Sequence, residues 1–215
     1  MIFRETNHWL LLLLAGILFT ACSGTDEQSG DEADYDSTLV LPRTDLMRLS
    51  EFKTPTGKVF VVRETPMFDT SLVNVIVKAA GFSRDTLTID FGEMDPIIAV
   101  HLDDLDKDGY GELYVITRST GSGQEGTIVG LCSNQDQQVS VISFEGATPY
   151  TMKEGEPYEG YLGHDSFSFD QGILTNTFQL SQPGEKIATA GNHRTVRYEL
   201  IRNESSARLR PVRQK

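Results

Sequence analysis

Hydrophobic side chains alternate with polar ones in many short segments of this chain, and the segments are rich in Val, Ile, Thr and Phe. A period of two is typical of β-strands, because successive side chains of a strand point to opposite faces of the sheet. Turn-forming residues separate the segments, and Asp170-Gln171-Gly172 reads as a tight hairpin. The expected strands are Lys58–Glu64, Ser71–Ala79, Thr86–Phe91, Ile97–Leu102, Glu112–Arg118, Thr127–Cys132, Val139–Phe144, Asp165–Asp170, Ile173–Leu180 and Arg194–Ile201.

This pattern predicts an all-β protein, an antiparallel β-sandwich or flattened barrel of about eight to ten short strands. Only Asp45–Phe52 looks helical, because Leu46, Leu49 and Phe52 would then share one face. No internal repeat of useful quality is present, so a propeller is not indicated.

The N-terminus has the features of a targeting segment. Arg4 precedes the apolar run Trp9–Phe19, which is short for a membrane-spanning helix and typical of a signal peptide. The next residues complete Phe19-Thr20-Ala21-Cys22, which resembles a bacterial lipobox, although Phe19 stands where Leu is usual. Cys22 is therefore the expected lipid anchor, and a plain secretory signal is the alternative. Ser23 after the cysteine resembles Gram-negative lipoproteins of the outer membrane, so we expect the protein in the bacterial cell envelope, facing the periplasm.

Four regions follow from composition: a lipoprotein signal peptide (1–21), a lipidated cysteine with an acidic flexible tether (22–45), a β-sandwich domain (46–203) and a basic tail (204–215). The tether is too polar to offset the entropy of ordering it. The tail is expected to fray. Its basic residues are Arg208, Arg210, Arg213 and Lys215.

The chain is acidic, with a formal net charge of −12. This charge argues against nucleic acid as a partner and favours a basic protein or cations. With Cys22 assigned to the lipid, Cys132 has no disulfide partner, and its apolar segment predicts a buried structural thiol. Both a monomer and a homodimer remain open.

One turn carries alternate carboxylates in the pattern D-x-D-x-D-G-x-x-E. Calcium takes six to eight oxygen ligands, and such a turn can present them inward. An EF-hand would need Glu at its twelfth position, which is Val115 here, so the turn instead resembles the shorter loops of integrin-like β-proteins. Turns held by Asp side chains without metal are the alternative. The candidate calcium ligands are Asp104, Asp106, Asp108, Tyr110 and Glu112.

A Gly/Ser-rich loop, Arg118–Gly126, joins two expected strands. Its glycines fit G-x-G-x-x-G, the fingerprint of dinucleotide binding, but that site needs a helix after the glycines. The β-branched segment Thr127-Ile128-Val129 follows instead, so we expect no nucleotide there.

Three stretches together resemble the periplasmic inhibitors of invertebrate-type (I-type) lysozyme, over Lys58 to Ile201. They read DLDKDGYGELYVITRSTGSG, GYLGHDSFSFDQGILTNTFQL and TAGNHRTVRYEL. The family carries an acidic turn, a strand and an R-S-x-G-S-G loop, then the elements G-H-D-x-F and G-x-x-R-x-x-x-Y. The matching residues of the last two elements are Gly163, His164, Asp165 and Phe167, and Gly191, Arg194 and Tyr198.

The resemblance implies a β-sandwich that inhibits I-type lysozyme by inserting this loop into the active-site cleft. The family loop usually continues to a tyrosine, whereas Gln124, Glu125 and Gly126 stand there in this chain. Ser71–Val75 also departs from the Ser-x-Gly-Ser-Tyr run that the family tends to show. A calcium-stabilised envelope binding module without inhibitor activity is the alternative function. The implied inhibitory residues are Arg118, Ser119, Gly121, Ser122 and Gly123.

We do not expect an enzyme. His101, His164 and His193 have no metal-binding spacing, and Ser122 lacks the G-x-S-x-G elbow of a nucleophile. His164 is expected to shape a turn where its strand begins, because neighbours in a strand face opposite ways and His164 could not act together with Asp165.

Overall fold

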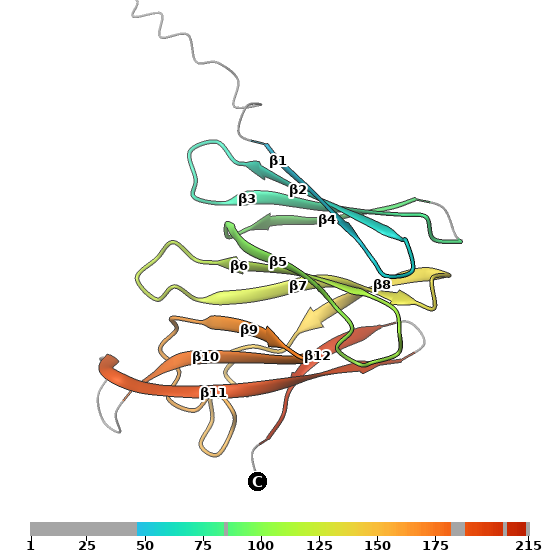
Figure 1. Ribbon diagram of the computed structural model, residues 1–215. Helices are drawn as coiled ribbons and strands as arrows, with labels where there is room; N and C mark the ends of the chain where they lie inside the picture. Colours follow the sequence, from blue (N-terminus) through green and yellow to red (C-terminus); the bar gives the residue numbers. More distant parts are fainter. Residues whose placement is uncertain (1–46, 84–85, 182–187, 204–205, 214–215) are drawn as a thin grey trace, which may run out of the picture. The chain divides into compact units, whose positions relative to one another are not determined.

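Two β-sheets make up the described part of the computed structural model, which comprises residues 47–83, 86–181, 188–203 and 206–213 (Figure 1). The smaller sheet has the order β1-β2-β3-β4, and the larger has the order β5-β6-β7-β8-β12-β11-β10-β9. The prediction of an all-β sandwich or flattened barrel is confirmed. The described residues form twelve strands, more than the expected eight to ten, and no helix.

The strands are β1 Arg48–Lys53, β2 Val59–Pro66, β3 Val73–Ala80, β4 Leu87–Met94, β5 Ile97–Asp103, β6 Glu112–Arg118, β7 Gly126–Asn134, β8 Gln138–Phe144, β9 Ser166–Asp170, β10 Ile173–Ser181, β11 Ala188–Arg202 and β12 Ala207–Pro211. Every pair is antiparallel except β8 and β12, which run parallel.

Strand β6 lies at the centre of the fold and is buried on both faces. Leu113 and Val115 face the small sheet, where they pack with the inward side chains of β2 and β3. Tyr114 and Ile116 face the other way, into a second core with side chains from β10, β11 and β12. The sequence ELYVITR is therefore apolar almost throughout, because alternate residues serve two different cores.

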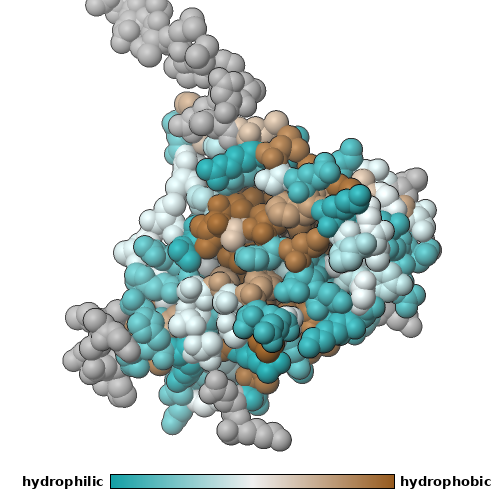
Figure 2. All heavy atoms as spheres, viewed as in Figure 1, coloured by the Kyte–Doolittle hydropathy of each residue, from teal (hydrophilic) through white to brown (hydrophobic). Residues whose placement is uncertain are grey.

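The large sheet bends until its two edge strands approach each other. His101 of β5 stacks on Phe169 of β9 with ring centroids 4.7 Å apart, and Tyr114 lies 5.0 Å from the same ring. The result is a flattened, nearly closed barrel with the small sheet packed on one side (Figure 1). Figure 2 shows hydrophobic residues exposed on one face, and a shallow groove between the sheets is lined by Phe52, Val62 and Ile98.

The expected helix at Asp45–Phe52 is wrong over its described part, since Arg48–Lys53 forms strand β1. Each of its residues from Arg48 to Lys53 pairs with one of β2. The apolar spacing did not reflect a buried face, because Leu49 remains 59% exposed while Phe52 packs on the core. Backbone pairing to a neighbouring strand decided the conformation.

The expected frayed tail is also wrong for its central part. Ala207–Pro211 forms β12, which lies between β11 and β8. Ala207 and Leu209 point into the core while Arg208 and Arg210 remain exposed. The arginines are thus the outer face of a strand, and the domain extends beyond the expected boundary at 203.

The N-terminal predictions lie outside the described residues: the signal peptide 1–21, the lipid anchor Cys22 and the tether 22–45. Within the described part of the chain, no helix has the length and hydrophobicity to cross a membrane. Cys132, by contrast, is described, and the prediction of a buried thiol is confirmed. Burial raises the pKa of this thiol, which disfavours the reactive thiolate.

Candidate functional site

The Gly/Ser loop connects β6 to β7 and presents its tip to solvent. Thr120, Gly121 and Ser122 are exposed, whereas Gly123 is half-buried. The Ser119 amide donates to the Glu125 carbonyl at 2.8 Å and closes the base of the loop. Among the described residues, the Ser122 hydroxyl has no hydrogen-bond partner, so it is free to bond to another molecule. The loop therefore extends from the end of the sheet (Figure 1).

The segment before β9 holds the inner side of this loop. The His164 amide donates to the Gly123 carbonyl at 2.6 Å, and the Asp165 amide donates to the Gln124 carbonyl at 3.3 Å. Gly163 has a φ of +82°, and a Cβ there would overlap the Gly123 carbonyl oxygen, so glycine is required. His164 has a φ of 59° and lies in the turn just before β9 begins at Ser166, as expected.

Asp165 anchors the two ends of the loop to one point. Its carboxylate accepts the Gly126 amide at 2.8 Å, and its carbonyl accepts the Arg118 guanidinium at 2.8 Å. Because Arg118 ends β6 and Gly126 begins β7, both strand ends are fixed relative to Asp165. Arg118 thus helps to hold the loop through its guanidinium.

A buried polar network continues from Asp165 into the core. The Asp165 carboxylate, on a residue only 2% exposed, accepts hydrogen bonds from the Tyr161 hydroxyl and from Asn176 Nδ2, the latter at 2.5 Å. Asn176 also contacts the Tyr158 hydroxyl at 3.3 Å, which in turn bonds to the Tyr198 hydroxyl. Burial raises the pKa of Tyr158 to about 12 and raises that of Tyr161 as well, so both phenols stay protonated.

The network joins two motifs that lie apart in the sequence. Asp165 belongs to the G-H-D-x-F element, and Tyr198 belongs to the G-x-x-R-x-x-x-Y element. Arg194 of the same element donates to the Pro157 carbonyl at 3.2 Å and so holds the segment that carries Tyr158. Asp165 supports the loop directly, and Tyr198 is linked to Asp165 through Tyr158 and Asn176.

A hollow beside the loop contains residues that the sequence did not single out. It is lined by Glu125 and Gly126 of the loop and by Met152, Tyr161 and Leu162 of the long β8–β9 connection. The loop itself lacks an aromatic residue, but Tyr161 supplies one at its base. Nothing in the local sequence signals this, because Tyr161 lies 35 or more positions away along the chain.

The acidic turn lies at the opposite end of β6. Lys107 and Gly109 have φ values of 60° and 87°, which allow the sharp reversal. Asp104 accepts the amides of Asp108 and Gly109 at 3.0 and 2.9 Å, and Asp108 accepts the Tyr110 amide at 2.9 Å. The turn therefore uses the side-chain-to-backbone bonds that were the metal-free alternative. The same bonds also fix its carboxylates in place.

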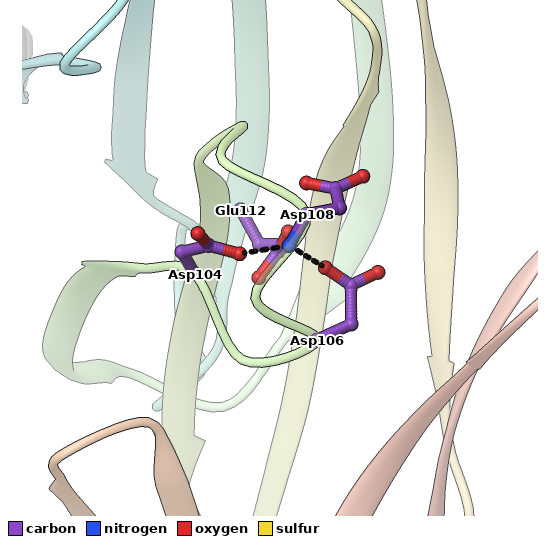
Figure 3. A group of neighbouring side chains, drawn as sticks. All are labelled: Asp104, Asp106, Asp108 and Glu112. Atoms are coloured by element: carbon purple, nitrogen blue, oxygen red, sulfur yellow. Dashed lines mark hydrogen bonds between the residues drawn. The ribbon is translucent and has the colours of Figure 1, made fainter.

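Glu112, the first residue of β6, is fully buried beneath the turn. Its Oε2 accepts the Leu105 amide at 2.7 Å and the Tyr114 hydroxyl at 3.2 Å, whereas its Oε1 has no hydrogen-bond partner. Burial raises the pKa of Glu112 to about 8, and nearby Asp106 adds to the effect. Figure 3 shows the Glu112 carboxylate between the side chains of Asp104 and Asp106.

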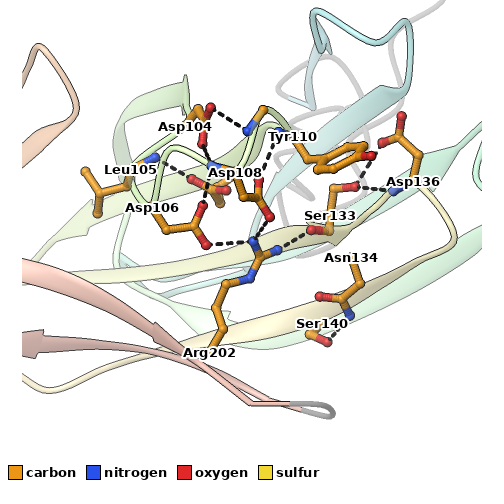
Figure 4. A network of polar contacts seen from close by, with 12 residues as sticks. Asp104, Leu105, Asp106, Asp108, Tyr110, Ser133, Asn134, Asp136, Ser140 and Arg202 are labelled. Carbon is orange, nitrogen blue, oxygen red and sulfur yellow. Dashed lines mark hydrogen bonds and ion pairs between the residues drawn. The ribbon is translucent and has the colours of Figure 1, made fainter.

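Arg202 of β11 is the cation of this cluster (Figure 4), although no local sequence pattern indicates it. Its Nη1 contacts Asp106 Oδ2 at 2.7 Å and also Asp108 Oδ2, while its Nη2 donates to the Ser133 carbonyl. Burial raises the pKa of Asp106 although Arg202 opposes this effect. One guanidinium therefore contacts two of the four carboxylates directly.

Comparison of the chain with protein-family models, with curated proteins and with solved structures finds no match. The resemblance to lysozyme inhibitors rests on the sequence elements alone.

Proposed function

We propose that this protein binds I-type lysozyme and inhibits it by inserting the loop tip, Ser119–Gly123, into the active-site cleft. The observation that carries this proposal is the exposed tip on a fixed base: Ser122 is exposed and unpartnered, while His164 and Asp165 hold the loop behind it. A loop fixed before binding loses little conformational entropy in the complex.

The chemistry of the tip suits a glycosidase cleft. Such a cleft contains catalytic carboxyl groups, and a serine hydroxyl can donate to or accept from a carboxyl. Gly121 and Gly123 add no side chain that would block a close approach. The acidic chain would also attract a basic lysozyme and speed the encounter.

Anchoring through Cys22 would place the inhibitor in the bacterial envelope, on the outer membrane facing the periplasm. A lysozyme that crosses the outer membrane would meet it before degrading the cell wall. In this proposal the protein acts by binding and carries out no reaction of its own.

The test is inhibition of an I-type lysozyme by the purified full chain. Ser122→Ala should weaken inhibition about tenfold, because one buried hydrogen bond of about 1–1.5 kcal/mol is lost. Ser122→Arg should weaken it by about a hundredfold or more, since a long charged side chain cannot enter the cleft. Ser50→Arg, the same change at an exposed serine of β1, is the matched control and should inhibit like the unmodified chain. Equal inhibition by all three variants would show that the loop tip does not enter the cleft.

A second candidate is an envelope binding module without inhibitor activity, whose fold calcium stabilises. Two observations favour it: Gln124–Gly126 stand where the inhibitors carry an aromatic, and Glu112 Oε1 is buried without a partner. This candidate would be favoured if the unmodified chain did not inhibit lysozyme and if calcium raised its Tm.

A further inference from the structure

The acidic turn has the dimensions of a calcium site. Asp104, Asp106, Asp108 and Glu112 each offer a carboxylate oxygen, and these four atoms lie within 4.8 Å of one another. Calcium binds oxygen at about 2.3–2.6 Å, so two ligands on opposite sides of the ion are about 4.8 Å apart. The spacing of the four oxygens is therefore compatible with ligands of one calcium ion.

Glu112 Oε1 gives an independent indication of a ligand. Glu112 is fully buried, and this oxygen has no partner among the described residues although Oε2 has two. A buried acceptor without a partner is uncommon in folded proteins, because it costs about 1–3 kcal/mol. The Glu112 carboxylate lies between the side chains of Asp104 and Asp106, and one of its oxygens lies within 4.8 Å of an oxygen of each of the other three acids (Figure 3).

The donor set selects among metals. All four candidate ligands are carboxylates, with no His or Cys of the kind that zinc prefers. Magnesium demands a near-ideal octahedron at about 2.1 Å and retains several waters, whereas calcium accepts irregular oxygen cages on flexible loops. The backbone amides that bond to Asp104 and Asp108 hold those carboxylates in position before any ion arrives.

We propose that Asp104, Asp106, Asp108 and Glu112 bind one calcium ion, and that Arg202 is the counter-cation of the cluster when calcium is absent. Arg202 contacts Oδ2 of Asp106 and of Asp108. Oδ1 of each carboxylate accepts one backbone amide, at 3.3 and 2.9 Å, and keeps a second lone pair for a metal. Its bond to the Ser133 carbonyl would keep the guanidinium nearby.

The expected effect of the ion is on stability. The cluster joins the β5–β6 turn to Arg202 of β11 and, through it, to Ser133 of β7. It lies at the end of β6 that is remote from the Gly/Ser loop, so this proposal is independent of lysozyme binding.

The test is thermal unfolding of the full chain after chelation, repeated with added CaCl₂ or MgCl₂. Calcium at about 1–10 mM should raise Tm by several degrees, in line with the millimolar affinity of many extracellular calcium modules. Magnesium should raise it much less. No shift with calcium would overturn the site and leave Arg202 as its permanent cation, and an equal shift with magnesium would overturn the selectivity.

Terbium substitutes for calcium, and Tyr110 in the turn should sensitise its luminescence. Terbium luminescence therefore measures binding to the site directly. Asp106→Asn and Glu112→Gln should each weaken terbium and calcium binding at least tenfold. Glu93→Gln, the same charge change at an exposed acid of β4, is the control and should leave binding unchanged. If Asp106→Asn binds as the unmodified chain does, the assignment is wrong.

Arg202→Gln separates the two parts of the proposal. Because the variant removes a competing cation, calcium should bind it more tightly, by about tenfold. Weaker binding in this variant would contradict the counter-cation role of Arg202.

Discussion

Asp165 is the residue on which the candidate site depends most. It accepts hydrogen bonds from Gly126, Tyr161 and Asn176, and its backbone carbonyl accepts one from Arg118. One buried carboxylate thus links the Gly/Ser loop to the core of the large sheet. This side chain fixes the loop base together with the backbone bonds of His164 and Ser119.

Asp165→Asn should therefore destabilise the fold and loosen the loop. The amide nitrogen of asparagine cannot accept the bonds that one carboxylate oxygen accepts, and hydrogen bonds to a charged group contribute about 1.5–3 kcal/mol each. We expect the free energy of unfolding, measured with urea, to fall by about 2–4 kcal/mol. Asp170→Asn, at an exposed position of β9, should change it by less than about 0.5 kcal/mol. Equal effects of the two changes would show that the network contributes little.

Sequence analysis could identify the residues of this site but not their contacts. The Gly/Ser loop and the His164-Asp165 pair both stood out, yet 39 positions separate Gly126 from Asp165. The roles of Tyr161 and Arg202 could not be predicted, because a lone Tyr or Arg in a chain of short strands has no local pattern. Only the closure of the large sheet brings these residues to the loop and to the acidic turn.

Strands with a clear apolar run between turn residues could be predicted from the sequence. Strands whose conformation depends mainly on pairing with a neighbouring strand could not. The expected and observed bounds of β6 are both Glu112–Arg118, because its apolar run is bounded by turn residues on each side. Strands β1 and β12 were missed, since one is largely exposed and the other alternates with arginines. Strand β1 pairs with β2, and β12 pairs with β11 and with β8, which lies far away in sequence.

Strand β12 is the element that joins the two halves of the large sheet. Leu209 is fully buried, and Leu209→Ala should lower the free energy of unfolding by about 2–5 kcal/mol through loss of packing and a cavity. Arg208→Ala, the adjacent exposed position, should cost less than about 1 kcal/mol. Urea denaturation of both variants measures the difference. A Leu209→Ala variant as stable as Arg208→Ala would mean that β12 is dispensable.

At the scale of the whole molecule, the two informative features of the sequence occupy separate places. The acidic turn and the Gly/Ser loop flank the seven residues of β6, so about 20 Å of strand lies between them. One end carries a cluster suited to stabilising the fold, and the other carries a loop suited to binding. The sequence presents them as one dense stretch, and the strand between them divides their roles.

The central claim is that the loop tip occupies the cleft of a lysozyme. Its most direct test is the affinity of the full chain for an I-type lysozyme with and without a chito-oligosaccharide that fills the cleft. If the tip and the glycan compete, the apparent Kd should rise in proportion to glycan concentration, about tenfold when the glycan is present at ten times its own Kd. An affinity that does not change when the cleft is filled, or no binding to the free enzyme, would contradict the claim.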